Sequence, residues 1–126
     1  MGKPLKILAV DDDFINLKLI SSMLKKNDNV HLIVEATNGL DALNLLKDHQ
    51  DIDLILLDIK MPVMDGIEFL VNFQPMREFK DIPVIVLTTD ETRKNEAFER
   101  GAFDFLVKPI REVELSAKIL KVVELS

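Results

Sequence analysis

Short runs of aliphatic and β-branched residues recur along the chain and indicate β-strands. There are five of them, at residues 5–10, 30–35, 53–57, 83–88 and 104–107. The first, third and fourth runs are almost continuously apolar, which is typical of strands covered on both faces of a parallel sheet. The pattern therefore predicts a buried parallel sheet.

Segments with helical spacing of apolar residues alternate with these strands, at residues 14–26, 38–49, 66–73, 91–100 and 112–125. Asn38 is a suitable N-cap for the second segment. The fourth segment offers little apolar surface beyond Ala97 and Phe98, so we expect a thinly anchored helix that stops at Gly101. The last segment carries two apolar stripes, one with Leu115, Ile119 and Val122 and the other with Val113, Ala117 and Leu120. We interpret the second stripe either as an exposed association surface or as ordinary core.

The order of strand then helix, repeated five times with short connections, predicts one α/β domain over residues 1–126. Right-handed crossovers place helices on both faces of a parallel sheet, which makes this a doubly wound (βα)5 fold. Ligand sites in such sheets form outside the carboxyl ends of the strands. The residues that follow each strand are therefore the candidates for function.

Composition and charge exclude several classes of function. The 126 residues are 48% hydrophobic and 30% charged, as in an ordinary globular domain, and the formal net charge of −6 disfavours nucleic acid and anionic membranes as partners. The absence of cysteine excludes disulfides and thiolate metal sites. No apolar run approaches the roughly 18 residues of a spanning helix, so we expect a cytoplasmic protein.

Polar side chains with complementary chemistry follow four of the five strands. Asp11 and Asp12 follow the first strand and Asp58 the third, while Thr88 ends the fourth and Lys108 follows the fifth. Like charges in one crevice are costly unless a cation or a reaction needs them. Carboxylate oxygens without histidine or cysteine suit Mg²⁺ better than zinc. The set predicts phosphoryl chemistry.

Four motifs in this order resemble the receiver domains of two-component response regulators of the chemotaxis-regulator type. They are Ile-Leu-Ala-Val-Asp-Asp-Asp at 7–13, Leu-Leu-Asp-Ile-Lys-Met-Pro-Val-Met-Asp-Gly at 56–66, Pro-Val-Ile-Val-Leu-Thr at 83–88 and Phe-Leu-Val-Lys-Pro at 105–109. The resemblance covers essentially the whole chain. It implies a flavodoxin-like sheet with strand order 2-1-3-4-5 and a phosphoacceptor signalling domain rather than an enzyme.

The resemblance also implies how the acidic site works. Asp58 would accept a phosphoryl group from the phosphohistidine of a sensor histidine kinase or from a phosphotransfer protein. Asp12, Asp58 and the backbone carbonyl of Lys60 would bind Mg²⁺ or Mn²⁺, with Asp11 acting through a bound water. Lys108 would contact a phosphoryl oxygen, as a charge-assisted donor can.

Switching and tuning roles follow from the same resemblance. Thr88 and Phe105 would form the switch that alters the face made by the fourth helix, fifth strand and fifth helix, and a homodimer through that face is a hypothesis. Phe105 also has a plain interpretation as core packing. Lys60 and Asp90 occupy positions that tune the lifetime of the phosphoryl group, and we hypothesise that they approach each other over the site and restrict the attacking water.

Several residues have structural interpretations. Asp13 precedes a helix and is expected to cap it, and Asp65-Gly66 is expected to form a turn that needs glycine's conformational freedom. The Lys108-Pro109 bond is a candidate for the cis form. His31 and His49 are expected to lie away from the acidic edge.

Two other functions compete with the receiver interpretation. Asp11-x-Asp13-x-Ile15 mimics the opening motif of haloacid-dehalogenase-type phosphatases, but Ile15 stands where Thr or Val is usual and no acidic pair follows Lys108. A flavodoxin is disfavoured because acidic residues in the first loop would repel the flavin phosphate and because Tyr and Trp are absent. Within the receiver family, the sequence leaves open a stand-alone regulator, part of a longer regulator, or a domain attached to a sensor kinase.

Overall fold

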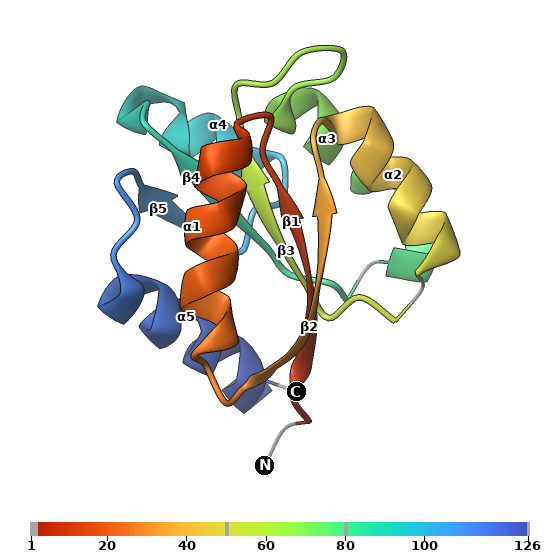
Figure 1. Ribbon diagram of the computed structural model, residues 1–126. Helices are drawn as coiled ribbons and strands as arrows, with labels where there is room; N and C mark the ends of the chain where they lie inside the picture. Colours follow the sequence, from red (N-terminus) through yellow and green to blue (C-terminus); the bar gives the residue numbers. More distant parts are fainter. Residues whose placement is uncertain (1–2, 50, 80, 126) are drawn as a thin grey trace.

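Five parallel strands form one twisted sheet in the order β2-β1-β3-β4-β5 (Figure 1). The structure is a computed structural model that describes residues 3–49, 51–79 and 81–125. The strands are β1 (Leu5–Val10), β2 (Val30–Ala36), β3 (Leu54–Asp58), β4 (Val84–Thr88) and β5 (Asp104–Val107). The predicted parallel sheet and its strand order are confirmed, with strand ends within one residue of the predicted ones.

Helices cover both faces of the sheet, as the predicted crossovers require. They are α1 (Phe14–Lys25), α2 (Gly39–Asp48), α3 (Gly66–Phe73), α4 (Lys94–Glu99) and α5 (Glu112–Leu125). Helices α1 and α5 pack on one face, while α2, α3 and α4 pack on the other (Figure 1). All five residues of β3 and of β4 are buried, which explains why their sequences lack polar alternation.

The segment between β4 and β5 differs from the prediction of one helix over 91–100. It forms a 3₁₀-helix η2 (Glu91–Arg93) followed by the short helix α4. Ala97 is buried in α4 whereas Phe98 is 39% exposed, so the segment has little apolar surface to hold a longer helix on the sheet. Gly101 follows in a left-handed conformation with φ 100°, as expected of a helix stop.

A second short helix was not predicted. The 3₁₀-helix η1 (Arg77–Phe79) lies between α3 and β4. Its Phe79 ring is buried and stacks on Phe73 with 6.3 Å between ring centroids. Phe79 anchors this turn to the core, and one anchoring ring gives no periodic pattern in the sequence.

The two stripes of α5 have different environments. The stripe of Leu115, Ile119 and Val122 is buried against β-strands and α1, whereas Val113 is 82% and Leu120 47% exposed. The second stripe is therefore surface and not core. Within the described ranges, no helix is both long enough and apolar enough to span a bilayer.

Candidate functional site

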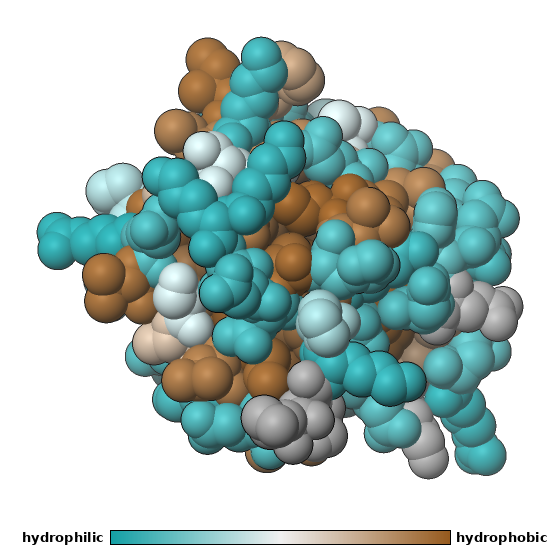
Figure 2. Space-filling model, turned by 60° about the horizontal axis from the view of Figure 1, so that its bottom comes forward, coloured by the Kyte–Doolittle hydropathy of each residue, from teal (hydrophilic) through white to brown (hydrophobic). Residues whose placement is uncertain are grey.

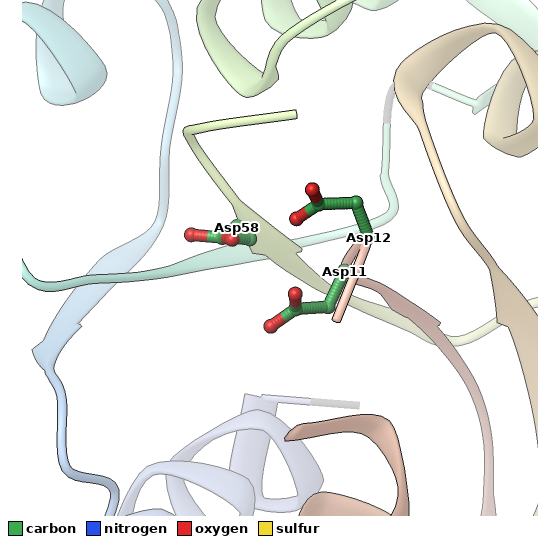
Figure 3. Close-up of side chains that lie close together, drawn as sticks. All are labelled: Asp11, Asp12 and Asp58. Carbon is green, nitrogen blue, oxygen red and sulfur yellow. The ribbon is translucent and has the colours of Figure 1, made fainter. Parts of the chain in front are cut away.

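The acidic residues predicted to lie at the carboxyl edge of the sheet do meet there. Asp11 and Asp12 follow β1 and Asp58 ends β3, its neighbour in the sheet. One carboxylate oxygen from each lies within 4.8 Å of the others, and the three side chains turn to the same side of the strand ends (Figure 3). Asp11 and Asp58 are 1% and 7% exposed, while Asp12 is open to solvent.

Burial of polar groups singles out this edge. Among the described residues, the buried polar or charged residues are Asp11, Asp58 and Thr88. All three lie at the carboxyl ends of adjacent strands, where the parallel sheet brings β1, β3 and β4 together. Because burying such groups is costly, their concentration in one place indicates a site built for chemistry.

Lys108 joins the cluster from the end of β5. Its Nζ atom donates to Asp11 Oδ2 at 2.8 Å and lies 3.4 Å from Asp58 Oδ2. Burial lowers the pKa of Lys108, but its hydrogen bond to Asp11 and the charge of Asp58 together raise the pKa by more, so the pKa is raised overall. The lysine therefore remains an ammonium group that faces both carboxylates.

Asp58 is the carboxylate whose ionisation the fold opposes. Burial raises the pKa of Asp58 to about 6, and this effect exceeds the lowering by the charge of Lys108; the nearby Asp11 adds to the rise. The Ile59 backbone N–H donates to Asp58 Oδ1 at 2.8 Å. That bond leaves Oδ2 as the oxygen that faces the cluster.

The loop after Asp58 is held close to the strand by a glycine. The Gly66 N–H donates to the Ile59 carbonyl at 2.8 Å, and a Cβ atom at Gly66 would lie 2.3 Å from the Asp58 carbonyl oxygen. Gly66 is required for this close approach rather than for a positive φ, which corrects the predicted reason. Asp65 caps α3 in a reciprocal capping box with Glu68.

Asp13 has the predicted capping role. Its Oδ1 accepts from the Ile15 N–H at 2.9 Å at the start of α1, and its own N–H donates to Asp11 Oδ1 at 2.9 Å. In a phosphatase of the dehalogenase type, the acidic residues of the first loop would have to face the substrate, because one of them is the nucleophile. Here Asp13 is committed to the helix and Asp11 to Lys108.

Thr88 and Phe105 lie on neighbouring strands beside the cluster. The Thr88 side chain is buried, and its Oγ1 accepts from the Asp90 N–H at 3.2 Å, which leaves the hydroxyl proton free to donate. The Thr88 carbonyl accepts from the Lys108 N–H at 2.8 Å, so the ends of β4 and β5 are tied together. Phe105 is 7% exposed and packs in the core with Ala97.

Lys60 and Asp90 lie on the loops that leave β3 and β4. Lys60 is exposed and its charge lowers the pKa of Asp90, but the larger causes of that shift are the bonds from Thr92 to the Asp90 carboxylate. Asp90 caps η2 through these bonds. Of the two residues expected to tune the lifetime of the phosphoryl group, Asp90 is therefore already hydrogen-bonded within its own loop.

The Lys108-Pro109 peptide bond is cis, as predicted.

A hollow at the opposite end of the sheet lies apart from the acidic cluster. It measures about 580 Å³ and is lined mainly by apolar side chains such as Ile52, Ile82 and Phe103. Figure 2, which brings this end forward, shows apolar surface between polar side chains. Of the two carboxylates that line it within the described ranges, Asp53 already accepts a backbone N–H of β1, so the described lining offers no convergent set of polar groups.

The histidines lie away from the acidic cluster, as expected. His31 lies on the edge strand β2. His49 ends α2, and its Nδ1 lies 3.2 Å from the Nζ atom of Lys6 near the start of β1. Neither histidine is placed to bind a group held by Asp58.

Comparison with known proteins decides the family. The family model for the response regulator receiver domain matches residues 7–120, which include every residue of the acidic cluster. The chain belongs to the response regulator receiver family. The receiver match includes β1 from Ile7 onward, the whole of the other four strands and most of α5, so the flavodoxin-like fold and the family agree.

One curated relative is about three times as long as the part of it that the chain matches. The chain is 42% identical over 116 residues to a protein-glutamate methylesterase/protein-glutamine glutaminase of Clostridium acetobutylicum, covering 89% of this chain and 33% of that protein. It thus spans about a third of the length of that relative. The receiver portion is what the two proteins share.

Solved structures show the same arrangement. The CheX-CheY-BeF3-Mg+2 complex from Borrelia burgdorferi matches with a TM-score of 0.86 and 29% identity over 95% of this chain and 90% of that one. The chemotaxis response regulator CheY4 of Vibrio cholerae matches with a TM-score of 0.84 and 32% identity over 94% and 98% of the two chains. The chain thus has the fold of known chemotaxis regulators.

Proposed function

We propose that this receiver domain accepts a phosphoryl group on Asp58 from a phosphohistidine of a sensor histidine kinase or a phosphotransfer protein. The observation that supports this proposal most strongly is the net charge of the acidic cluster and Lys108. Three carboxylates face one ammonium group, which leaves an excess of two negative charges when all are ionised. A divalent cation offsets that excess, and the donor set of hard oxygens fits Mg²⁺ or Mn²⁺.

The cation site would use the Asp12 and Asp58 carboxylates and the Lys60 backbone carbonyl, with Asp11 reaching the ion through water. A bound Mg²⁺ would supply positive charge that offsets the repulsion between the nucleophile and the phosphoryl oxygens. The CheY structure from Borrelia burgdorferi, whose complex contains BeF3 and Mg+2, supports this assignment by its similarity to the chain.

The residues of the chain position the reactants and provide the nucleophile. The ionised Asp58 carboxylate can attack without a general base. A carboxylate oxygen of Asp58 attacks phosphorus, the new P–O bond forms, and the P–N bond to the imidazole breaks with its electron pair left on nitrogen. The rigid end of β3 aims Asp58, and Lys108 would neutralise a phosphoryl oxygen. No oxidant or further reactant is needed.

The output would come from Thr88 and Phe105. Donation of the free Thr88 hydroxyl proton to a phosphoryl oxygen would hold that side chain against the site, and Phe105 packs beside β4 in the buried position. We propose that this stabilises one arrangement of the face formed by α4, β5 and α5, to which an output partner or a second copy binds. The domain would be a cytoplasmic signalling module, with its self-catalysed phosphorylation and dephosphorylation as its chemistry.

Incubation with radiolabelled acetyl phosphate and Mg²⁺ tests the proposal, because the Asp58 carboxylate can displace acetate as it displaces imidazole. One acid-stable, base-labile phosphate per chain is expected, lost in Asp58→Asn and retained in Asp13→Asn. Continuous release of phosphate with no labelled protein would instead indicate a phosphatase and overturn the proposal.

A further inference from the structure

Two backbone hydrogen bonds fix the loop between β3 and α3. At its base the Gly66 N–H donates to the Ile59 carbonyl at 2.8 Å, which closes the loop beside Asp58. Near its far end the Met64 carbonyl accepts from the Gly39 N–H at 2.9 Å. Gly39 is the first residue of α2, which lies beside α3 on the same face of the sheet (Figure 1). The second bond therefore joins the loop to a different helix.

The contact between Gly39 and the loop leaves no room for a side chain. A Cβ atom at Gly39 would lie 2.8 Å from both the Cγ atom and the carbonyl oxygen of Met64. Gly39 is buried, and the Met64 side chain is partly buried against the core. Glycine is thus required here because the start of α2 touches the loop directly.

The Met64 carbonyl comes from a turn with an unusual backbone conformation. The Met64 N–H donates to the Pro62 carbonyl at 2.7 Å, which closes a three-residue turn centred on Val63. Val63 has φ 67°, which a β-branched residue rarely adopts, and its side chain is 74% exposed. Strained backbone persists only where the surrounding contacts hold it, and the bond from Gly39 is such a contact.

The same loop carries Lys60, whose backbone carbonyl is a proposed ligand of the cation. Lys60 lies between the two bonds, after Ile59 and before Met64. A side-chain ligand can be aimed by its rotamer, but the position of a backbone carbonyl depends on the path of the loop. Groups that orient a ligand affect metal affinity as the ligand itself does. The contact that fixes the loop therefore bears on cation binding.

We propose that Gly39 is a positioning residue for the cation site. Through its bond to Met64, α2 holds the β3–α3 loop in the path that the Lys60 carbonyl needs to bind Mg²⁺. The role rests on the proposed function, which supplies the cation site. Because a coupling free energy is reciprocal, the start of α2 is held more firmly against the loop when Mg²⁺ is bound. Helix α2 lies outside the proposed ligand set and would still respond to the cation.

Gly39→Ala tests this role because the new Cβ atom forces Met64 away from α2. Isothermal titration calorimetry of the unphosphorylated protein is expected to give a Kd for Mg²⁺ about ten-fold higher than that of the wild type, a loss typical of removing a group that orients a metal ligand. Gly101→Ala is the control, because it strains a residue with φ 100° beside the hollow at the opposite end of the sheet. It is expected to lower stability and leave the Kd unchanged.

Amide hydrogen exchange in the wild type tests the reciprocal effect and decides the matter if Gly39→Ala does not fold. Saturating Mg²⁺ is expected to slow exchange of the Gly39 N–H about ten-fold, the same factor as the loss of affinity. Two other amides serve as controls. The His49 N–H donates to the Leu45 carbonyl at 2.8 Å at the other end of α2, and the Gly101 N–H donates to the Phe98 carbonyl at 3.0 Å. Exchange at both controls is expected to stay unchanged.

The outcomes separate the role of Gly39 from the proposed function. Wild-type binding of Mg²⁺ with an unchanged Kd in folded Gly39→Ala overturns the role of Gly39 alone. So does exchange at Gly39 that Mg²⁺ leaves unchanged or slows no more than exchange at the control amides. A wild-type protein that binds no Mg²⁺ overturns the cation site of the proposed function and the role of Gly39 with it.

Discussion

Lys108 donates its shortest side-chain hydrogen bond to Asp11, at 2.8 Å, and not to the predicted phosphoacceptor Asp58, from which it lies 3.4 Å away. The lysine is thus the positive charge that makes a buried Asp11 tolerable. A cation bound to the acidic cluster would share that task. Stability and cation binding should therefore be coupled through Lys108.

Lys108→Met is expected to lower the free energy of unfolding by about 3 kcal/mol in EDTA, because it leaves a buried carboxylate unpaired. Saturating Mg²⁺ should stabilise this variant more than it stabilises the wild type. Thermal unfolding with and without Mg²⁺ measures the difference. Lys118→Met is the matched control, since Lys118 pairs with Asp104 at 2.9 Å outside the cluster. The loss of stability in this control should not depend on Mg²⁺. Equal Mg²⁺ stabilisation of Lys108→Met and the wild type would contradict the coupling.

The raised pKa of Asp58 predicts a pH dependence of stability in EDTA. Because its pKa rises from 3.8 to about 6 on folding, the folded protein binds this proton more tightly, so the free energy of unfolding falls as pH rises through that window. Asp58→Asn removes this slope and, allowing for solvent screening, raises stability at pH 7 by about 1–2 kcal/mol. Chemical denaturation at a series of pH values measures both effects.

Asp51 provides a control, because its pKa shift has the opposite sign to that of Asp58. Its hydrogen bond from Lys6 lowers the pKa of this exposed carboxyl group, so its contribution to stability is present above the unfolded pKa and is lost as pH falls through the folded one. Asp51→Asn should therefore weaken the protein slightly at pH 7. A stabilisation by Asp51→Asn, or an unchanged slope in Asp58→Asn, would count against these assignments.

Gly66→Ala should be more damaging than Gly101→Ala. The new Cβ would meet the Asp58 carbonyl at 2.3 Å, so the loop must move and we expect a loss of about 3 kcal/mol. Gly101→Ala, at φ 100° with its nearest neighbour 3.6 Å away, should cost about 1–2 kcal/mol by backbone strain alone. Urea unfolding compares them, and equal losses would show that the close approach is unimportant.

The exposed stripe of α5 predicts where a second copy would bind. With beryllofluoride and Mg²⁺, sedimentation is expected to show dimers that Leu120→Glu abolishes. Leu32→Glu is the matched control, because Leu32 on β2 is equally exposed at 47% but lies on another surface. A sedimentation profile that beryllofluoride leaves unchanged would reject the dimer.

Much of this molecule could be predicted because its signals are local. Continuous apolar runs mark β3 and β4, and the parallel order then brings Asp11, Asp58 and Thr88 to one edge. The cap at Asp13 is equally local, since its acceptor and donor are two residues apart. Such features depend on the sequence within a few residues of each position.

The features that escaped prediction depend on contacts that no short pattern encodes. Lys108 and Asp11 are 97 residues apart, and which of two carboxylates the lysine prefers is decided by packing. The η1 turn depends on one ring, Phe79, against Phe73.

Locating the phosphoryl group by mass spectrometry tests the central proposal most directly. After incubation with acetyl phosphate and Mg²⁺, the intact protein is expected to gain one phosphoryl group, and borohydride reduction followed by peptide mapping should place it on Asp58. The gain should vanish in EDTA and in Asp58→Asn. A phosphoryl group on another residue, or one that persists in Asp58→Asn, would contradict the account.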